Sequence, residues 1–200
     1  MAHTVVALNC PGCGEPANTT EKNCKYCGRP VIISTFNSVA SMTIPELNKY
    51  TNTYKQALAL SPNDKDLHTS IGMCYLKLKL YDNALPSFEK AMECDFDNSE
   101  NYFYAGVCLL KGQKPFNAHR SGIMRILELL NAAIQIEPRG IFYYFRAYIK
   151  YDFYERKSLN ISPKYDEDVA SAKANNVTLS DIQILSEILG KPFPNEIAVA

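Results

Sequence analysis

The chain lacks an excess of charge of either sign and lacks long apolar runs. Its 21 Lys and Arg residues balance 21 Asp and Glu residues, so its net charge gives no reason to expect binding to nucleic acid or to an acidic membrane surface. No apolar stretch approaches the length of a membrane-spanning helix, and residues 1–9 contain neither the basic start nor the apolar core of a secretory signal. We therefore expect a cytoplasmic protein with no membrane partner.

The chain also has few of the groups from which active sites are built. Its three histidines, His3, His68 and His119, are scattered along the sequence. A nucleophile elbow, a phosphate-binding glycine loop and the H-E-x-x-H motif are all missing. His119 beside Arg120 could bind an anion, although a solvated loop is the simpler interpretation. We expect no enzymatic activity and no small-molecule substrate.

Four of the seven cysteines have the spacing of metal ligands. They form two C-x-x-C pairs: Cys10, Cys13, Cys24 and Cys27. Each pair is followed by a glycine, whose tolerance of positive φ suits a tight turn that aims two sulfur atoms at one point. Two such turns would form a closed tetrahedral site for structural Zn²⁺. Two disulfides or reduced core cysteines are the alternatives, but a cytosolic protein would not keep such disulfides.

The N-terminal segment resembles a zinc ribbon. Apolar residues predict short strands on either side of the cysteine pairs, at Val5, Val6 and Leu8 and at Val31, Ile32 and Ile33. Residues 18–20 are a plausible hairpin tip. The resemblance implies a ribbon over residues 1–36 that zinc folds and that leaves no open metal position for catalysis. Residues 37–42 are small and polar, as in a linker.

The rest of the chain repeats itself. His68-x-x-Ile71-Gly72-x-x-Tyr75 recurs 34 residues later as Tyr102-x-x-Ala105-Gly106-x-x-Leu109. The next recurrence comes after 42 residues, which predicts an insertion at about 112–122. The three other cysteines, Cys74, Cys94 and Cys108, fall within these segments and are expected in the core.

This pattern resembles the tetratricopeptide repeat (TPR) over residues 43–156. The resemblance implies a mainly α protein, a TPR-like α-solenoid of antiparallel helix pairs, with a small N-terminal β zinc-ribbon domain. Gly72 and Gly106 match the small residue that lets two helices approach closely. Tyr148 replaces that glycine in the last unit, which predicts a wider spacing or another angle there. An ordinary helical bundle is the alternative.

Local signals place several helix ends. Thr43 and Glu46, with Pro45 between them, form a capping box that begins a helix running to about Leu60. Residues 157–200 are expected to form capping helices and a tail. One of these helices would end near Ala174, and the last would run over residues 179–189.

The TPR resemblance also implies a concave groove, lined by the first helix of each pair. Its groove positions are Thr69, Met73, Leu76, Lys77, Phe103, Val107, Leu110, Lys111, Phe145, Ile149, Asp152 and Phe153. This mostly apolar set suits an apolar stripe of a peptide or helix. It lacks the Lys and Asn set that grips a C-terminal carboxylate in chaperone adaptors. The alternative is that the chain's own C-terminal helices fill the groove.

These observations favour a non-enzymatic scaffold or adaptor that binds a protein partner. A second hypothesis is an RNA- or ribonucleoprotein-associated factor, because residues 111–164 hold ten basic residues against four acidic ones, interleaved with tyrosines. The repeat, however, requires many of those tyrosines for packing. A third hypothesis is a redox or zinc-sensing switch in which the four N-terminal cysteines release their metal.

Overall fold

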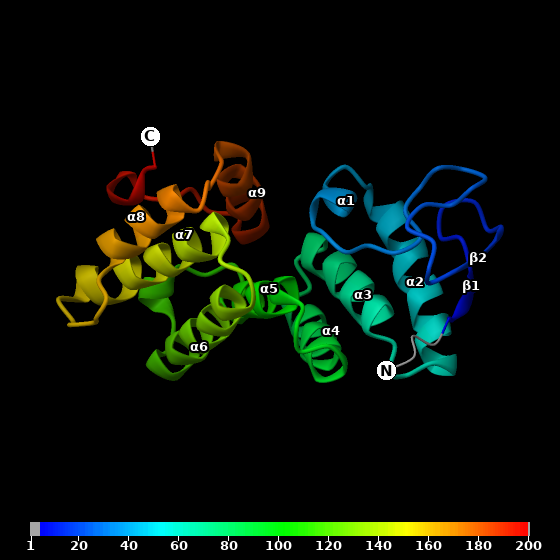
Figure 1. Cartoon of the computed structure of the whole chain (residues 1–200), viewed down its shortest axis with the longest axis horizontal. Coiled ribbons are helices and arrows are strands. Elements are labelled where there is room, and N and C mark those ends of the chain that lie inside the picture. The colour runs from blue at the N-terminus through cyan, green and yellow to red at the C-terminus, as the bar shows by residue number, and fades with distance from the viewer. Residues whose placement is uncertain (1–4, 200) are drawn as a thin grey trace. The chain divides into compact units, whose positions relative to one another are not determined.

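The computed structural model describes residues 5–199 and is mainly helical. The chain divides into two compact units, residues 1–96 and 97–200 (Figure 1). The first unit contains the N-terminal ribbon together with the first helices. Within this unit the ribbon packs against the helices that follow it.

The ribbon consists of two small hairpins. Strand β1 (Ala7–Asn9) pairs antiparallel with β2 (Pro16–Asn18), and Leu8 lies opposite Ala17. The second hairpin is closed by a single bridge between Asn23 and Pro30. Residues 18–20 are therefore not the tip of a central hairpin, because the turn at 19–20 comes between the two hairpins.

The strand predicted at residues 31–33 is not formed, so that prediction is wrong. The backbone there bends. The Val31 N–H still donates to the Lys22 carbonyl at 2.9 Å, but the next polar groups bond to side chains of two helices. The hydroxyl of Tyr54 donates to the Val31 carbonyl, and the Ile33 N–H donates to the Ser70 hydroxyl. Burial of Val31 and Ile33 against these helices explains their apolar character.

Four helices complete the first unit: α1 (Asn37–Ala40), α2 (Ile44–Leu60), α3 (Lys65–Lys77) and α4 (Tyr81–Cys94). The Thr43 N–H donates to the Glu46 carboxylate at 2.9 Å, as the capping box predicts. Helix α1 lies where a linker was expected. It buries Val39 completely and packs next to α3 (Figure 1).

The second unit continues the pattern of paired helices. It contains α5 (Ser99–Leu109), η1 (Pro115–Asn117), α6 (Arg120–Ile136), α7 (Gly140–Ile149), η2 (Lys150–Tyr154), η3 (Glu155–Lys157), α8 (Tyr165–Ala174), α9 (Leu179–Leu189) and η4 (Asn195–Ile197). Helix α5 packs on α6, and α7 packs on α8. Residues 110–119 join α5 to α6, whereas residues 78–80 join α3 to α4, so the extra residues of the longer repeat fall in this connection.

Aromatic side chains form much of the core of the second unit. The ring of Phe103 lies 4.9 Å from that of Phe142 and 5.7 Å from that of Phe145, which ties α5 to α7. Tyr148, at the position where the repeat has glycine, packs its ring 4.9 Å from that of Phe193. The C-terminal segment therefore covers the face of α7 that carries Tyr144 and Tyr148.

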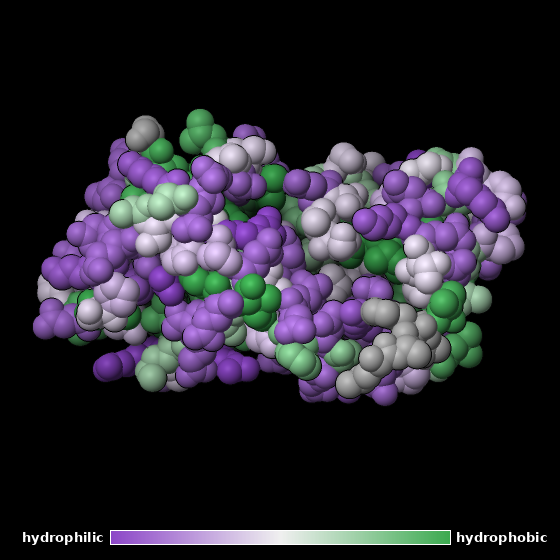
Figure 2. Space-filling model, in the orientation of Figure 1, coloured by the Kyte–Doolittle hydropathy of each residue, from purple (hydrophilic) through white to green (hydrophobic). Residues whose placement is uncertain are grey.

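No helix within residues 5–199 is long and apolar enough to cross a membrane. On the face shown in Figure 2, hydrophilic side chains predominate and hydrophobic ones form small separate groups.

Candidate metal centre and repeat groove

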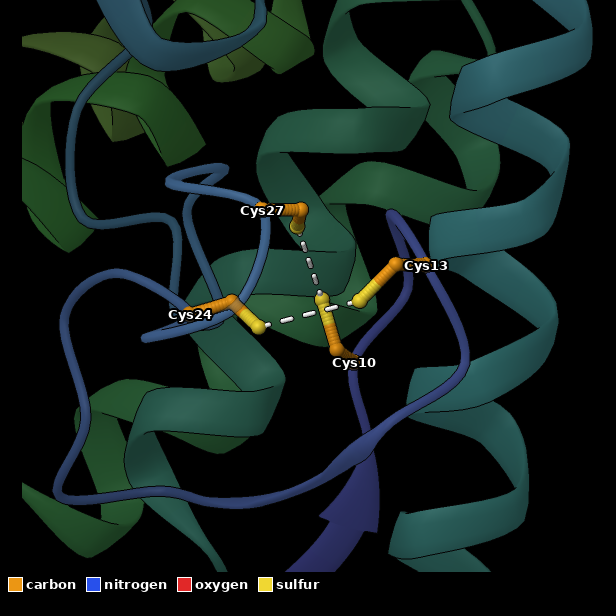
Figure 3. Close-up of side chains that lie close together, drawn as sticks. All are labelled: Cys10, Cys13, Cys24 and Cys27. Carbon is orange, nitrogen blue, oxygen red and sulfur yellow. Dashed lines mark hydrogen bonds between the residues drawn. The ribbon is translucent and has the colours of Figure 1, made fainter.

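The four N-terminal cysteines converge on one point (Figure 3). Their sulfur atoms all lie within 4.8 Å of one another. Cys10 Sγ is 3.7 Å from Cys27 Sγ, and Cys13 Sγ is 3.7 Å from Cys24 Sγ. In a tetrahedral site with Zn–S bonds of about 2.3 Å, the sulfur atoms are about 3.8 Å apart. The donor set and its spacing therefore fit a zinc ion.

The two cysteine turns have the same backbone geometry. In the first, the Cys10 N–H donates to the Glu15 carbonyl at 2.7 Å and the Gly14 N–H donates to the Cys10 carbonyl at 2.8 Å. In the second, Cys24 donates to Arg29 and Gly28 donates to Cys24, both at 2.8 Å. Gly14 has φ +88° and Gly28 has φ +70°. Both glycines thus adopt the left-handed backbone that the sequence predicted for them.

Backbone N–H groups point at sulfur atoms of the cluster, and such hydrogen bonds stabilise the thiolate, which is the form that binds zinc. The Gly12 N–H donates to Cys10 Sγ at 3.3 Å. Backbone N–H groups of Cys27 and Tyr26 lower the pKa of Cys24 to about 7. Burial raises the pKa of Cys10. Despite an opposing backbone hydrogen bond, desolvation and hydrogen bonds to the neighbouring thiols raise the pKa of Cys13 to about 12. Cys10 and Cys24 are buried, whereas Cys13 and Cys27 are exposed. The cluster therefore lies at the edge of the ribbon, with two ligands inside and two at the surface.

An ion pair connects the second cysteine turn to α2. Arg29 Nη1 lies 3.0 Å from Glu46 Oε1, and Glu46 is also the capping residue of α2. The aliphatic part of Arg29 lies against the first turn, where a Cβ added to Gly12 would be 2.7 Å from Arg29 Cδ. Arg29 thus joins both cysteine turns to the first long helix.

Most of the predicted groove residues are buried. Of the twelve positions only Lys111 is exposed and Lys77 is half-buried, while the other ten are buried. Asp152 accepts from the Phe116 N–H at 2.7 Å and pairs with Arg156, so the inserted segment folds onto this position. In the first unit, the Lys77 ammonium lies 5.7 Å from the Phe36 ring. Partner binding at these positions stays a prediction. It requires a movement that exposes the buried side chains.

The remaining candidate residues do not gather into a site. Cys74 and Cys108 are buried and Cys94 is half-buried. His119 caps the start of α6, where its Nδ1 lies 2.8 Å from the Ser121 hydroxyl. His68 Nε2 lies 2.7 Å from the Pro62 carbonyl oxygen. His3 lies outside residues 5–199.

The basic segment of residues 111–164 is partly internal. Arg146 and Lys150 both pair with the buried carboxylate of Asp168, at 2.6 and 2.7 Å. Sequence reasoning missed this cluster, because Asp168 is distant in sequence and resembles an ordinary acid in the first turn of a helix. Tyr144 and Tyr148 are buried against Phe193. The RNA hypothesis is left with exposed basic residues such as Lys114.

No protein-family profile and no curated protein sequence matches this chain. Among solved structures, it is similar to a thermophilic TPR protein from Thermus thermophilus, at 17% identity and a TM-score of 0.54, over 72% of this chain and 74% of that one. It also matches the MamA MSR-1 C2 structure at 18% identity and a TM-score of 0.46, over 76% and 72% of the two chains. The chain therefore has a TPR-like fold of helix pairs, with a four-cysteine cluster near its N-terminus.

Proposed function

We propose that this protein is a non-enzymatic scaffold that binds a protein partner in the cytoplasm, and that Cys10, Cys13, Cys24 and Cys27 hold a structural zinc ion. The observation that carries the proposal is the TPR-like fold. Helix-pair repeats present an extended surface to peptides and helices. Among the described residues, the histidines and the three cysteines outside the cluster are spread over α3, α4, α5 and the start of α6.

The zinc ion would fold the ribbon. A four-thiolate site is closed, so the bound metal supplies folding energy and no catalytic water. Outside the four cysteines, the two hairpins of residues 5–30 bury few apolar side chains, chiefly Val6, Leu8 and Ala17. Segments this small usually need a metal or disulfides. The cytoplasm would keep the four thiols reduced and available to the metal.

Metal content and folding test the zinc proposal together. We expect the purified chain to contain about one zinc ion, and Cys13→Ser to lose most of it. Cys94→Ser is the matched control, because Cys94 is also partly exposed but lies in α4, away from the cluster. Metal analysis by mass spectrometry and amide exchange of residues 5–30 are the two measurements. Zinc binding by Cys13→Ser equal to that of the control would contradict the proposal.

Affinity purification from cell extract tests the scaffold proposal. We expect a defined protein to co-purify, to survive nuclease treatment and to tolerate moderate salt. A chain that recovers only RNA, with binding that falls steeply as salt rises, would contradict the scaffold and favour the RNA hypothesis. Reversing the charge of Lys77 and of Lys111 separately then tests whether the accessible ends of the predicted groove contribute to partner binding.

A further inference from the structure

Residues 30–39, which we call the strap, lie across the face formed by α2 and α3. The hydroxyls of Tyr50 and Tyr54 donate to the carbonyls of Pro30 and Val31 at 3.0 and 2.8 Å. The Ile33 N–H donates to the Ser70 hydroxyl at 2.9 Å, and that hydroxyl lies 3.2 Å from the Ile33 carbonyl. Side chains of two helices thus hold the main chain of the strap, much as a groove holds a bound peptide.

The apolar side chains of the strap are buried as well. Val31, Ile33 and Val39 are fully buried and Phe36 is 3% exposed. On α3, Ser70, Met73 and Lys77 share one face because they are spaced by one and two helical turns. Ser70 bonds to the strap, and Lys77 lies over Phe36. Met73 and Lys77 are two of the predicted groove positions, so the strap occupies the groove face of α3.

Both ends of the strap are fixed. Its first residue, Pro30, follows the second cysteine turn and pairs with Asn23 across the hairpin. Its last three residues belong to α1, which packs on α3 and leads into the cap of α2. A segment tethered at both ends has a high effective concentration at its site, and loss of one tether weakens docking without changing any contact. Docking of the strap costs the conformational entropy of ten residues and gains the free energy of burying four apolar side chains and forming four hydrogen bonds. These opposing free energies are of similar size, so the tethers decide whether the strap stays docked.

We propose that the strap is a tethered occupant of a peptide site on α2 and α3, that the metal-loaded ribbon holds it there, and that metal release opens this site to an extended apolar peptide of a partner. The chemistry of that peptide follows from the strap itself, since apolar side chains fill the positions of Val31, Ile33 and Phe36. This inference rests on the proposed zinc ion and specifies where a partner docks.

A labelled peptide with the sequence of residues 30–40 tests the proposal on the full chain. We expect the zinc-loaded chain to bind it at least tenfold more weakly than the same chain after chelation. The double variant Ile33→Ser/Phe36→Ser weakens the strap and leaves the face of α3 intact, so it should bind the peptide even with zinc present. Adding Ser70→Ala to this variant should weaken binding again, because it removes a group that holds the peptide backbone.

Equal, weak binding by the loaded chain, the chelated chain and the folded double variant would overturn the proposal. Amide exchange supplies a second measurement that does not depend on the peptide. On chelation the Ile33 amide should lose protection while the amides of α3 keep theirs. If the amides of α3 lost their protection together with the Ile33 amide, the proposal would be overturned, because the strap would then be an inseparable part of the core.

Two further measurements separate the possible outcomes. Zinc content, measured on the same samples, distinguishes a failure of the zinc proposal from a failure of the strap, since the double variant tests the strap without any metal change. Light scattering of the chelated chain tests for exchange of straps between two copies. If the chelated chain formed dimers and the labelled peptide dissociated them, a second copy of this chain would occupy the site. That result would overturn the assignment of the site to a partner.

Discussion

Substitution of Gly72 by alanine tests the packing of the first helix pair. A Cβ built on Gly72 would lie 2.8 Å from Phe88 Cε1, with two more atoms of the same ring at 3.0 and 3.1 Å. Phe88 is fully buried in α4, so its ring has little room to move. Gly106 holds the equivalent position in the next repeat, yet a Cβ there would meet no atom nearer than Ile126 Cγ2 at 3.8 Å. The two glycines, identical in the repeat pattern, should therefore respond in opposite directions.

The magnitudes follow from two opposing effects. Alanine in place of glycine in a helix interior stabilises by about 0.8–1 kcal/mol. Overpacking of a filled core destabilises by about 1–3 kcal/mol. Gly72→Ala should thus destabilise by roughly 1 kcal/mol, whereas Gly106→Ala should stabilise by up to about 1 kcal/mol because only the propensity effect acts. The unfolding free energies of the two variants should differ by about 2 kcal/mol.

Urea unfolding of the zinc-loaded chain, followed by circular dichroism, measures this difference. The double variant Gly72→Ala/Phe88→Leu provides the rescue, because the smaller side chain makes room for the added methyl group. We expect the substitution at Gly72 to cost less in the Phe88→Leu background than in the wild-type background. A Gly72→Ala variant as stable as Gly106→Ala, or a cost at Gly72 that is the same in both backgrounds, would refute the packing argument.

Three other predictions concern the second unit and the first helix cap. Gly140→Ala should destabilise by roughly 1–3 kcal/mol, because its Cβ would lie 2.5 Å from the Val177 backbone nitrogen; Gly122→Ala, which meets nothing within 4 Å, should be neutral or stabilising in the same urea assay. Burial raises the pKa of Glu100 above its ordinary 4.5, although an ion pair with a neighbouring arginine opposes this shift. The folded chain therefore binds this proton more tightly than the unfolded chain does, and wild-type stability relative to Glu100→Gln should fall as pH rises from 4.5 through the raised pKa; a pH-independent difference would contradict the shift. Thr43→Ala should cost about 1 kcal/mol in thermal unfolding through loss of the cap, and an unchanged midpoint would show that the cap contributes nothing.

The sequence by itself determined the features that depend on a few neighbouring residues. The spacing of Cys10, Cys13, Cys24 and Cys27 predicted their cluster, since two turns of fixed geometry suffice to bring four sulfur atoms together. Helix α9 runs over Leu179–Leu189 as predicted and ends at Gly190, whose φ of +64° is the left-handed backbone that such an end requires. The repeat interval predicted the helix pairs, because the first helix of each pair carries the small and bulky residues that pack against the second.

Only the tertiary structure decided which surfaces remain open. Val31, Ile32 and Ile33 form an apolar run that is typical of a strand, yet Val31 and Ile33 are buried where Tyr54 of α2 and Ser70 of α3 bond to their backbone. Ten predicted groove positions are likewise buried in the folded chain. Gly72 and Gly106 occupy the same position in their repeats, but only Gly72 faces an aromatic ring at contact distance. Local preferences specify what each helix can bury, whereas contacts between residues far apart in sequence decide what buries it.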